Sequence, residues 1–352
     1  MKREPINATN FITDEKTNKV YISNLIDGES GDLDKHTRGI LRSSIEDFCS
    51  NCEPLSNTKD VWARDYMPIQ LTKDIFLGYT YKPDYLEKYP NCITNWQLHN
   101  VRTRRHSFNN IEVIQIPLIL DGGNVVKAVL DGKPCMIMCD KVLSENNIDK
   151  ESKTEVENFK KWWKQWWNNY FKDTEMELVL IPWDGKKENP IGHADGMVRY
   201  IGNGHVLMTN YPDFDKKKKY GFDKKLDTGQ KDENDYGEKL KTALKGFKIE
   251  PLKFWDEFAD DYTFQLLFDE SWCYINYLQV GNRILVPSLG YQKLDDEARS
   301  QIENAYKNAN QEVVVQTIDC NMTPIVKDMN EKMNSGGALN CLTWTIQAKT
   351  KE

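Results

Sequence analysis

The chain has 352 residues, of which 39% are hydrophobic and 29% are charged, so it is not an intrinsically disordered protein and can bury a sizeable core. Its formal net charge of −7 argues against nucleic acid as the main partner. No apolar run approaches the roughly 20 residues that span a bilayer, and residues 1–20 hold no apolar signal region. Provided that no leader was removed, we expect a cytoplasmic protein with no membrane partner.

Strands and helices alternate along the first half of the chain. Residues 19–25 are typical of a strand, and residues 38–49 place their apolar side chains on one helical face. Ser152 and Glu155 form a capping-box pattern, after which apolar residues repeat at helical spacing up to Tyr170. Further strands are predicted at 69–78, 111–120, 124–130, 134–139 and 176–182.

The second half continues the alternation around one polar segment. Gly202-Asn203-Gly204 predicts a hairpin between two strands. Residues 211–236 are polar and of mixed charge, and we interpret them as a surface loop inserted into a single catalytic domain, 1–352. A strand pair at 273–289, a helix carrying Ala298, Ile302 and Tyr306, and a strand at 312–318 follow. The recurring strand–strand–helix–strand unit predicts an α/β protein, either an open sheet or a closed set of repeats.

Two cysteine pairs could suggest zinc, namely Cys49 with Cys52 and Cys135 with Cys139. The second pair lies in a predicted strand, where Cys135, Ile137 and Cys139 alternate onto one face. Core packing is therefore the favoured interpretation of both pairs, and no metal or disulfide framework is predicted.

Four short segments carry polar residues directly beside apolar ones, at 61–68 (VWARDYMP), 118–126 (LILDGGNVV), 189–200 (NPIGHADGMVRY) and 334–344 (NSGGALNCLTW). His193 and Asp195 are separated by one residue, so both side chains point the same way on an extended chain. Taken singly, Asp65 could pair with Arg64 on the surface, Asp121-Gly122 could form an ordinary turn, and His193 and Cys341 could be core residues. All four ordinary interpretations would have to be correct at once if these segments had no common role, so we favour a functional site formed by the four segments.

The order of these motifs resembles the agmatine deiminase and bacterial peptidylarginine deiminase family. The matching patterns are Trp-x-Arg-Asp-x-x-Pro at 62–68, Asp-Gly-Gly at 121–123, Gly-His-x-Asp at 192–195 and Gly-Gly-x-x-x-Cys-x-Thr at 336–343. The resemblance implies the pentein fold, a five-bladed pseudo-symmetric α/β propeller of ββαβ-type units. Asp121, Met67 and Asn340 stand where that family usually has Glu, Gly and His, which affects substrate identity more than the chemistry.

The resemblance also implies a role for each site residue. Asp65 and Asp195 would clamp the planar guanidinium, and Cys341 would attack its central carbon. His193 would protonate the leaving amine and later activate water, while Asp121 orients its ring. Trp62, Asn124 and Asn276 complete the predicted substrate-binding set. The reaction would release ammonia and leave a ureido group, with no metal or cofactor.

The expected partner is therefore a small guanidino substrate, most simply agmatine, which would become N-carbamoylputrescine. A peptidyl-arginine or free-arginine deiminase and an amidinotransferase are the alternatives on the same fold. A non-catalytic binding module would not need both Cys341 and His193, and an unrelated thiol protease would not explain the paired aspartates. Relatives are often dimeric, so a homodimer is one expectation for the assembly.

Overall fold

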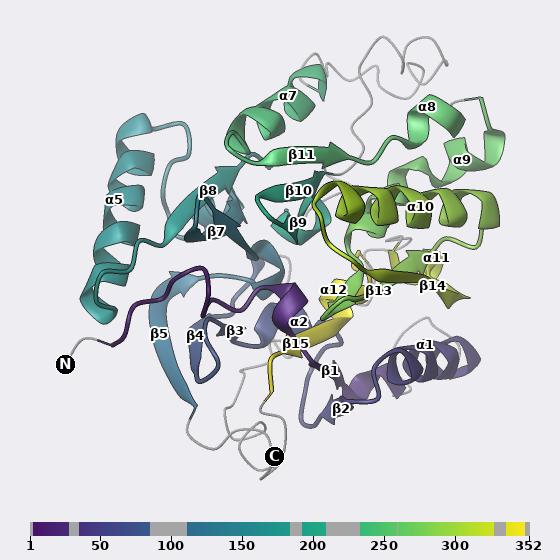
Figure 1. Cartoon of the computed structure of the whole chain (residues 1–352), viewed down its shortest axis with the longest axis horizontal. Helices are drawn as coiled ribbons and strands as arrows, with labels where there is room; N and C mark the ends of the chain where they lie inside the picture. The colour runs from purple at the N-terminus through teal and green to yellow at the C-terminus, as the bar shows by residue number, and fades with distance from the viewer. Residues whose placement is uncertain are drawn as a thin grey trace.

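Five small sheets stand around the centre of the molecule, as blades, in the computed structural model (Figure 1). It describes residues 3–27, 35–84, 111–183, 192–208, 233–258, 260–326 and 336–348. Within that part each sheet has three strands. The blades are β15 (Thr343–Ile346), β1 (Lys19–Ser23) and β2 (Cys52–Leu55); β3 (Ile69–Gln70), β4 (Ile75–Thr80) and β5 (Glu112–Ile119); β6 (Val126–Leu130), β7 (Lys133–Cys139) and β8 (Glu177–Ile181); β9 (Val198–Gly202), β10 (His205–Met208) and β11 (Lys248–Pro251); and β12 (Leu278–Val280), β13 (Arg283–Ser288) and β14 (Val314–Asn321).

Every blade has the same strand order and directions. The first strand runs antiparallel to the second, and the second runs parallel to the third. A parallel pair needs a crossover connection, and in four of the five blades the described crossover from the second to the third strand holds a long helix. These crossover helices are α1 (Lys35–Phe48), α5 (Lys153–Tyr170), α7 (Glu233–Ala243) and α10 (Gln292–Asn308). Figure 1 shows α1, α5 and α7 on the outer side of the sheets.

The ring of blades closes where the two ends of the described chain meet. β15 supplies the first strand of the blade that β1 and β2 complete, with Tyr21 opposite Trp344. Their rings pack at a centroid distance of 5.2 Å, and the Trp344 indole N–H donates to the Pro68 carbonyl at 2.8 Å. The last strand thus joins the first blade to the second.

The remaining elements are short turns that connect blades and helices. They are η1 (Asp14–Lys16), η2 (Asn24–Asp27), α2 (Ala63–Tyr66), η5 (Gly122–Asn124), α4 (Lys141–Glu145), η6 (Ala194–Gly196), α8 (Phe254–Phe258), α9 (Tyr262–Leu267), η8 (Phe268–Ile275), α11 (Thr323–Val326) and α12 (Leu339–Leu342). None of the helices in the described ranges is both long and apolar enough to cross a membrane.

The cores lie between the sheets and the helices that pack on them. The predicted face of α1 is correct, because Leu41, Ile45 and Phe48 are buried against the strands. Ser152 caps α5 by accepting from the Glu155 N–H, as the sequence pattern predicts.

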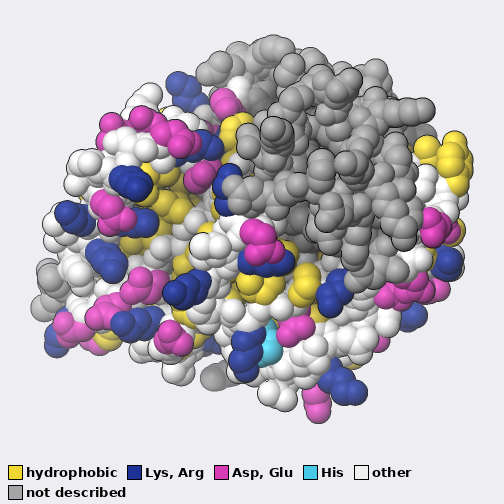
Figure 2. All heavy atoms as spheres, turned by 90° about the horizontal axis from the view of Figure 1, so that it is seen from above, with side chains coloured by type: hydrophobic (Ala, Val, Ile, Leu, Met, Phe, Trp, Pro, Cys, Tyr) yellow, Lys and Arg dark blue, Asp and Glu magenta, His cyan; other side chains and the backbone are white. Residues whose placement is uncertain are grey.

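Charged pairs on the surface contribute less to stability than the buried cores, since exposed pairs are well solvated. On the face in Figure 2, basic and acidic side chains lie interspersed rather than gathered by sign.

The first strand of each blade is its inner strand, at the centre of the ring, and these inner strands carry buried polar side chains. Gln70, Lys127, Arg199, Gln279 and Thr345 each come from the first strand of a different blade and are at most 9% exposed. Arg199 pairs with Asp14 of η1 at 2.7 Å and lies over the Tyr277 ring at 4.8 Å. Burial lowers the pKa of Lys127 to about 8, although Asp14 opposes the shift.

Two predicted strands differ from the structure. The strand expected at 69–78 is a hairpin, because the polar residues after Leu71 turn the chain and β3 runs antiparallel to β4. The strand pair expected at 273–289 begins only at Leu278, since η8 extends to Ile275. In the predicted surface loop, residues 211–232 lie outside the described ranges and Glu233 already begins α7. Cys135, Ile137 and Cys139 pack together in one core, as expected.

Candidate active site

Five turns meet at one end of the inner strands, and each lies immediately before the first strand of a blade. They are α2 before β3, η5 before β6, η6 before β9, the end of η8 before β12, and α12 before β15. Equivalent positions in the blades lie at the same end of the ring, so residues as far apart in the sequence as Arg64 and Asn340, which are separated by 276 positions, become neighbours. All the residues of the predicted site lie on these turns or at their borders: Trp62, Asp65, Asp121, Asn124, His193, Asp195, Asn276 and Cys341.

His193 lies between two carboxylates. Its Nε2 is 2.9 Å from Asp121 Oδ2, and its Nδ1 is 3.5 Å from Asp65 Oδ1. All three side chains are at most 5% exposed. Burial lowers the pKa of His193, but Asp65 and the hydrogen bond to Asp121 outweigh burial and raise that pKa to about 9. The imidazole is therefore protonated at neutral pH.

Asp65 occupies the opposite side of the imidazole ring. Its Oδ1 accepts a hydrogen bond from the Gly123 N–H at 2.9 Å. Burial raises the pKa of Asp65 to about 7, helped by Asp121 and Asp195 and opposed by His193. The site thus concentrates more negative than positive charge in a space from which water is largely excluded.

Cys341 faces the other predicted clamp residue. Its Sγ lies 3.5 Å from Asp195 Oδ2, and its backbone N–H donates to Asn276 Oδ1 at 3.2 Å. Burial raises the pKa of the Cys341 thiol well above its usual value, with further increases from Asp195 and Asp65. The cysteine is only 6% exposed and sits in the single turn of α12.

The glycines of the motifs are required by close approach. A Cβ on Gly122 would lie 2.0 Å from the Arg64 carbonyl oxygen, and one on Gly123 would lie 2.5 Å from Asp65 Oδ1. A Cβ on Gly337 would lie 2.3 Å from Cζ3 of Trp62, which is 7% exposed. Trp62 therefore packs directly on the segment that leads into Cys341.

Asn124 and Asn276 lie in the site, but their amides are bound to protein groups. Asn124 Oδ1 accepts from the N–H groups of Cys139 and Ala194, at 2.7 and 3.3 Å. Asn276 accepts from the Cys341 N–H and donates to the Asp195 carbonyl at 3.3 Å. These contacts show that both residues link neighbouring turns of the site, and their contact with the substrate stays a prediction.

Three further residues support this site although the sequence patterns predict no role for them in it. Arg64 and Asn340 link two of the turns, with Arg64 Nη2 donating to Asn340 Oδ1 at 2.9 Å. Tyr79 donates to the backbone carbonyls of Asp65 and Met67, at 2.6 and 2.8 Å, and so supports α2 from beneath. Arg64 and Asn340 stand inside the motifs, whereas nothing around Tyr79 distinguishes it from any buried strand residue.

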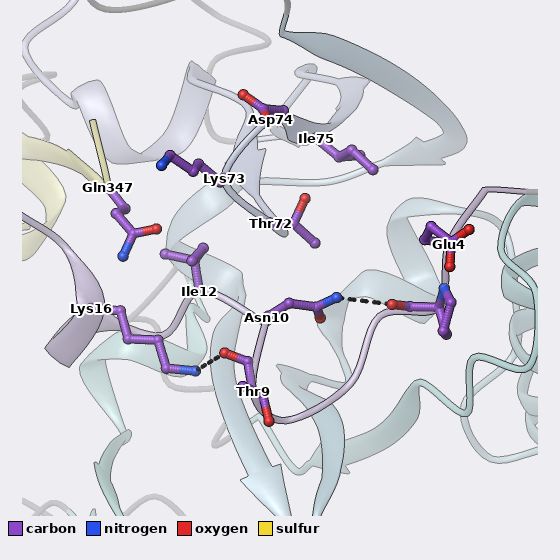
Figure 3. Close-up of a pocket in the computed structure, with 11 residues that line it drawn as sticks. Glu4, Thr9, Asn10, Ile12, Lys16, Thr72, Lys73, Asp74, Ile75 and Gln347 are labelled. Atoms are coloured by element: carbon purple, nitrogen blue, oxygen red, sulfur yellow. Dashed lines mark hydrogen bonds between the residues drawn. The ribbon is translucent and has the colours of Figure 1, made fainter. Parts of the chain in front are cut away.

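A separate pocket of about 320 Å³ lies away from this site (Figure 3). It is lined by the N-terminal segment around Asn10, by Lys73 after β3 and by Gln347 after β15. Residues after the inner strands lie at the opposite end from the turns that precede them. None of the predicted site residues lines this pocket. Within the described ranges, no group of three or more His, Cys, Asp or Glu side chains is placed to hold a metal ion.

The fold is that of the guanidine-modifying deiminases. The family model described as Porphyromonas-type peptidyl-arginine deiminase matches residues 43–346, so the chain belongs to that family. A comparison with curated proteins gives no match.

Solved structures are similar over nearly the whole chain. A candidate arginine deiminase from Porphyromonas gingivalis has a TM-score of 0.61 at 15% identity, covering 96% of this chain and 98% of that one. The agmatine deiminase of C. jejuni, solved with substrate bound, has a TM-score of 0.60 at 15% identity and covers 97% and 96%. The agmatine deiminase of Enterococcus faecalis has a TM-score of 0.58 at 13% identity and covers 99% and 100%. These likenesses confirm the predicted pentein propeller.

Proposed function

We propose that this protein hydrolyses the guanidino group of agmatine to a ureido group and releases ammonia, with Cys341 as the nucleophile. The observation that carries the proposal is the placement of a thiol and an imidazolium among three buried carboxylates. Buried carboxylates without enough positive charge are unfavourable unless a cation completes the site. A guanidinium is a planar cation that binds carboxylates through paired N–H groups.

Binding and activation are linked in this arrangement. Asp65 lies beside His193, and Asp195 lies beside Cys341. Burial raises the pKa of Cys341, and these carboxylates raise it further, so they disfavour the thiolate when no cation is bound. A bound guanidinium compensates their charge, so the thiol loses its proton to solvent as the substrate binds, while His193 keeps its own. The nucleophile is then formed only in the presence of its target.

His193 supplies the proton chemistry of both half-reactions. Attack by the Cys341 thiolate gives a tetrahedral adduct, and the imidazolium protonates the amine that leaves as ammonia. The remaining group is a covalent thiouronium on Cys341. The imidazole, now neutral, removes a proton from the water whose oxygen attacks this carbon. The C–S bond then breaks, the proton of the new hydroxyl group passes to the Cys341 sulfur, and the carbonyl of the ureido product forms. Asp121 holds the ring by its 2.9 Å hydrogen bond through both steps.

Agmatine is the proposed substrate because it needs no cation for its distal end. Among the described residues near the site, each basic side chain already has an anion or acceptor: Arg64 donates to Asn340, Arg199 pairs with Asp14, and Lys141 pairs with Asp84 at 2.7 Å. A substrate carboxylate would require a basic partner. The similar structures from C. jejuni and E. faecalis are also agmatine deiminases.

Peptidyl-arginine is the second candidate, because the matching family model carries that name. Its backbone groups would need hydrogen-bond partners at the rim rather than a carboxylate partner. An amidinotransferase would transfer the amidino group to an amine and release no ammonia without an acceptor.

The test is ammonia release from agmatine, free arginine, guanidinoacetate and an arginine-containing peptide, each without an added amine acceptor. Release from agmatine with a higher kcat/KM than from the other three supports the proposal. A preference for the peptide would show that peptidyl-arginine, and not agmatine, is the substrate. Activity only with an added amine would show that the enzyme transfers the amidino group instead of hydrolysing the substrate. The Cys341→Ala variant is the control for contaminating activity.

A further inference from the structure

Asn340 connects the turn that carries Cys341 to the turn that carries Asp195. The side chain is 3% exposed, and its Nδ2 donates to Asp195 Oδ2 at 2.6 Å. The same carboxylate oxygen lies 3.5 Å from Cys341 Sγ. Asn340 thus contacts the clamp residue at the oxygen nearest the nucleophile.

Arg64 determines which end of the Asn340 amide faces the carboxylate. Its Nη2 donates to Asn340 Oδ1 at 2.9 Å and to Thr345 Oγ1 at 3.1 Å, and its Nε donates to the Asn340 carbonyl at 3.3 Å. A guanidinium has donors only, so the atom facing Arg64 must be the amide oxygen. The NH₂ group must then face Asp195.

We propose that Arg64 and Asn340 form a positioning relay that fixes the Asp195 carboxylate for guanidinium binding; this inference rests on the proposed function. Two consecutive residues of α2, Arg64 and Asp65, then determine the positions of both clamp carboxylates. Asp65 enters the site directly, and Arg64 orients Asp195 through Asn340. Since the amide of Asn340 does not titrate, its donor to Asp195 is present at every pH at which the protein is folded.

The first test replaces the donor while keeping its size. Asn340→Asp is expected to raise KM for the guanidino substrate and to lower kcat/KM roughly 10- to 100-fold, the loss typical of one hydrogen bond to a charged group. Asn18→Asp is the matched control, because the Asn18 amide also bonds two partners, the N–H and carbonyl of Ala348 beyond the far end of β15, at 2.7 and 3.0 Å. A kcat/KM for Asn340→Asp equal to that of the control overturns the relay.

A double-variant cycle tests the chain of contacts. Arg64→Met removes the group that orients the amide, so adding Asn340→Ala to it is expected to cause no further loss of kcat/KM. Multiplicative losses would show that the two residues act separately and would overturn the relay. Unfolding temperatures are measured for every variant. If Asn340→Asp does not fold, the kinetic test is made with Arg64→Met, which leaves Asn340 in place.

Alkylation of Cys341 by iodoacetamide gives a readout that needs no substrate. Asn340→Leu removes the donor to Asp195 without adding a charge, so the less compensated carboxylate should move the pH midpoint of Cys341 alkylation upward, whereas Asn18→Leu should leave it unchanged. An unchanged midpoint in a folded Asn340→Leu variant contradicts the relay. If the wild-type protein releases ammonia from no guanidine, the proposed function fails, and the alkylation midpoints still decide the relay.

Discussion

Asp195 Oδ2 lies 3.5 Å from Cys341 Sγ, so the protein places a carboxylate directly against its own candidate nucleophile. An adjacent anion makes a thiol harder to ionise, which is the reverse of the usual activation of a catalytic cysteine by a neighbouring cation. The arrangement suits the proposed reaction, in which the cationic guanidinium of the substrate compensates that carboxylate. The chemistry and the specificity of the site then have the same physical origin.

Removing the thiol should separate catalysis from folding. Cys341→Ala is expected to abolish ammonia release while lowering the free energy of unfolding by only about 1 kcal/mol, because a small side chain is lost at one turn. The variant should still bind a guanidino substrate, measured by calorimetry. Wild-type turnover by this variant, or loss of the folded state, would contradict the assignment.

The pH dependence of kcat/KM should have two limbs set by Asp65 and His193. The pKa of Asp65 is raised to about 7 by burial, so as the pH falls through that value one clamp carboxylate is neutralised and guanidinium binding weakens. The pKa of His193 reaches about 9 because Asp65 and Asp121 outweigh its burial, so above that pH no proton remains for the leaving amine. Ammonia release measured across roughly pH 5.5–10 should therefore be greatest between these values. A rate that keeps increasing beyond the upper value would exclude His193 as the acid.

Asp121 and Asp65 should give different kinetic defects although both contact His193. Asp121→Asn removes the orienting charge at Nε2, so it should lower kcat and move the basic limb to lower pH. Asp65→Asn removes a charge that faces the substrate, and truncating one partner of a buried charged pair costs about 3–5 kcal/mol, so KM should rise on the order of a hundredfold or more. Substrate binding in the Cys341→Ala background separates the two effects. Equal affinity for guanidine with and without the Asp65 charge would contradict the clamp.

Gly337 should be as sensitive as a catalytic residue although it takes no part in the chemistry. A Cβ there would lie 2.3 Å from the Trp62 ring, so Gly337→Ala must displace either that ring or the turn leading to Cys341. We expect a loss of kcat/KM on the order of tenfold or more, because small misplacements of a nucleophile are costly. Gly39→Ala in α1, where a Cβ meets nothing within 4 Å, is the matched control.

Much of this architecture can be predicted from local patterns in the sequence. The helical face ending at Phe48, the cap at Ser152 and the Gly202-Asn203-Gly204 hairpin depend on residues close together in the chain, so periodicity and turn chemistry identify them. The same patterns do not show how the ring closes. β15 has four residues, and its pairing with β1 depends on a partner more than 300 positions away.

The candidate site, like the fold, could be predicted from the sequence only in part. The motifs predict that Asp65, His193, Asp195 and Cys341 come together, and the structure brings them together. Hydrogen-bond partners are not encoded locally, however, so the motifs could not predict that Asn124 and Asn276 bind backbone groups of the neighbouring turns. The bond from Arg64 to Asn340 spans 276 positions and could only be found in the folded chain.

The most direct test of the account is mass spectrometry of the protein quenched during turnover of agmatine. We expect a covalent amidino adduct on Cys341, formed together with ammonia and absent from Cys341→Ala. Steady ammonia release with no adduct on Cys341, or with the adduct on another cysteine, would contradict it.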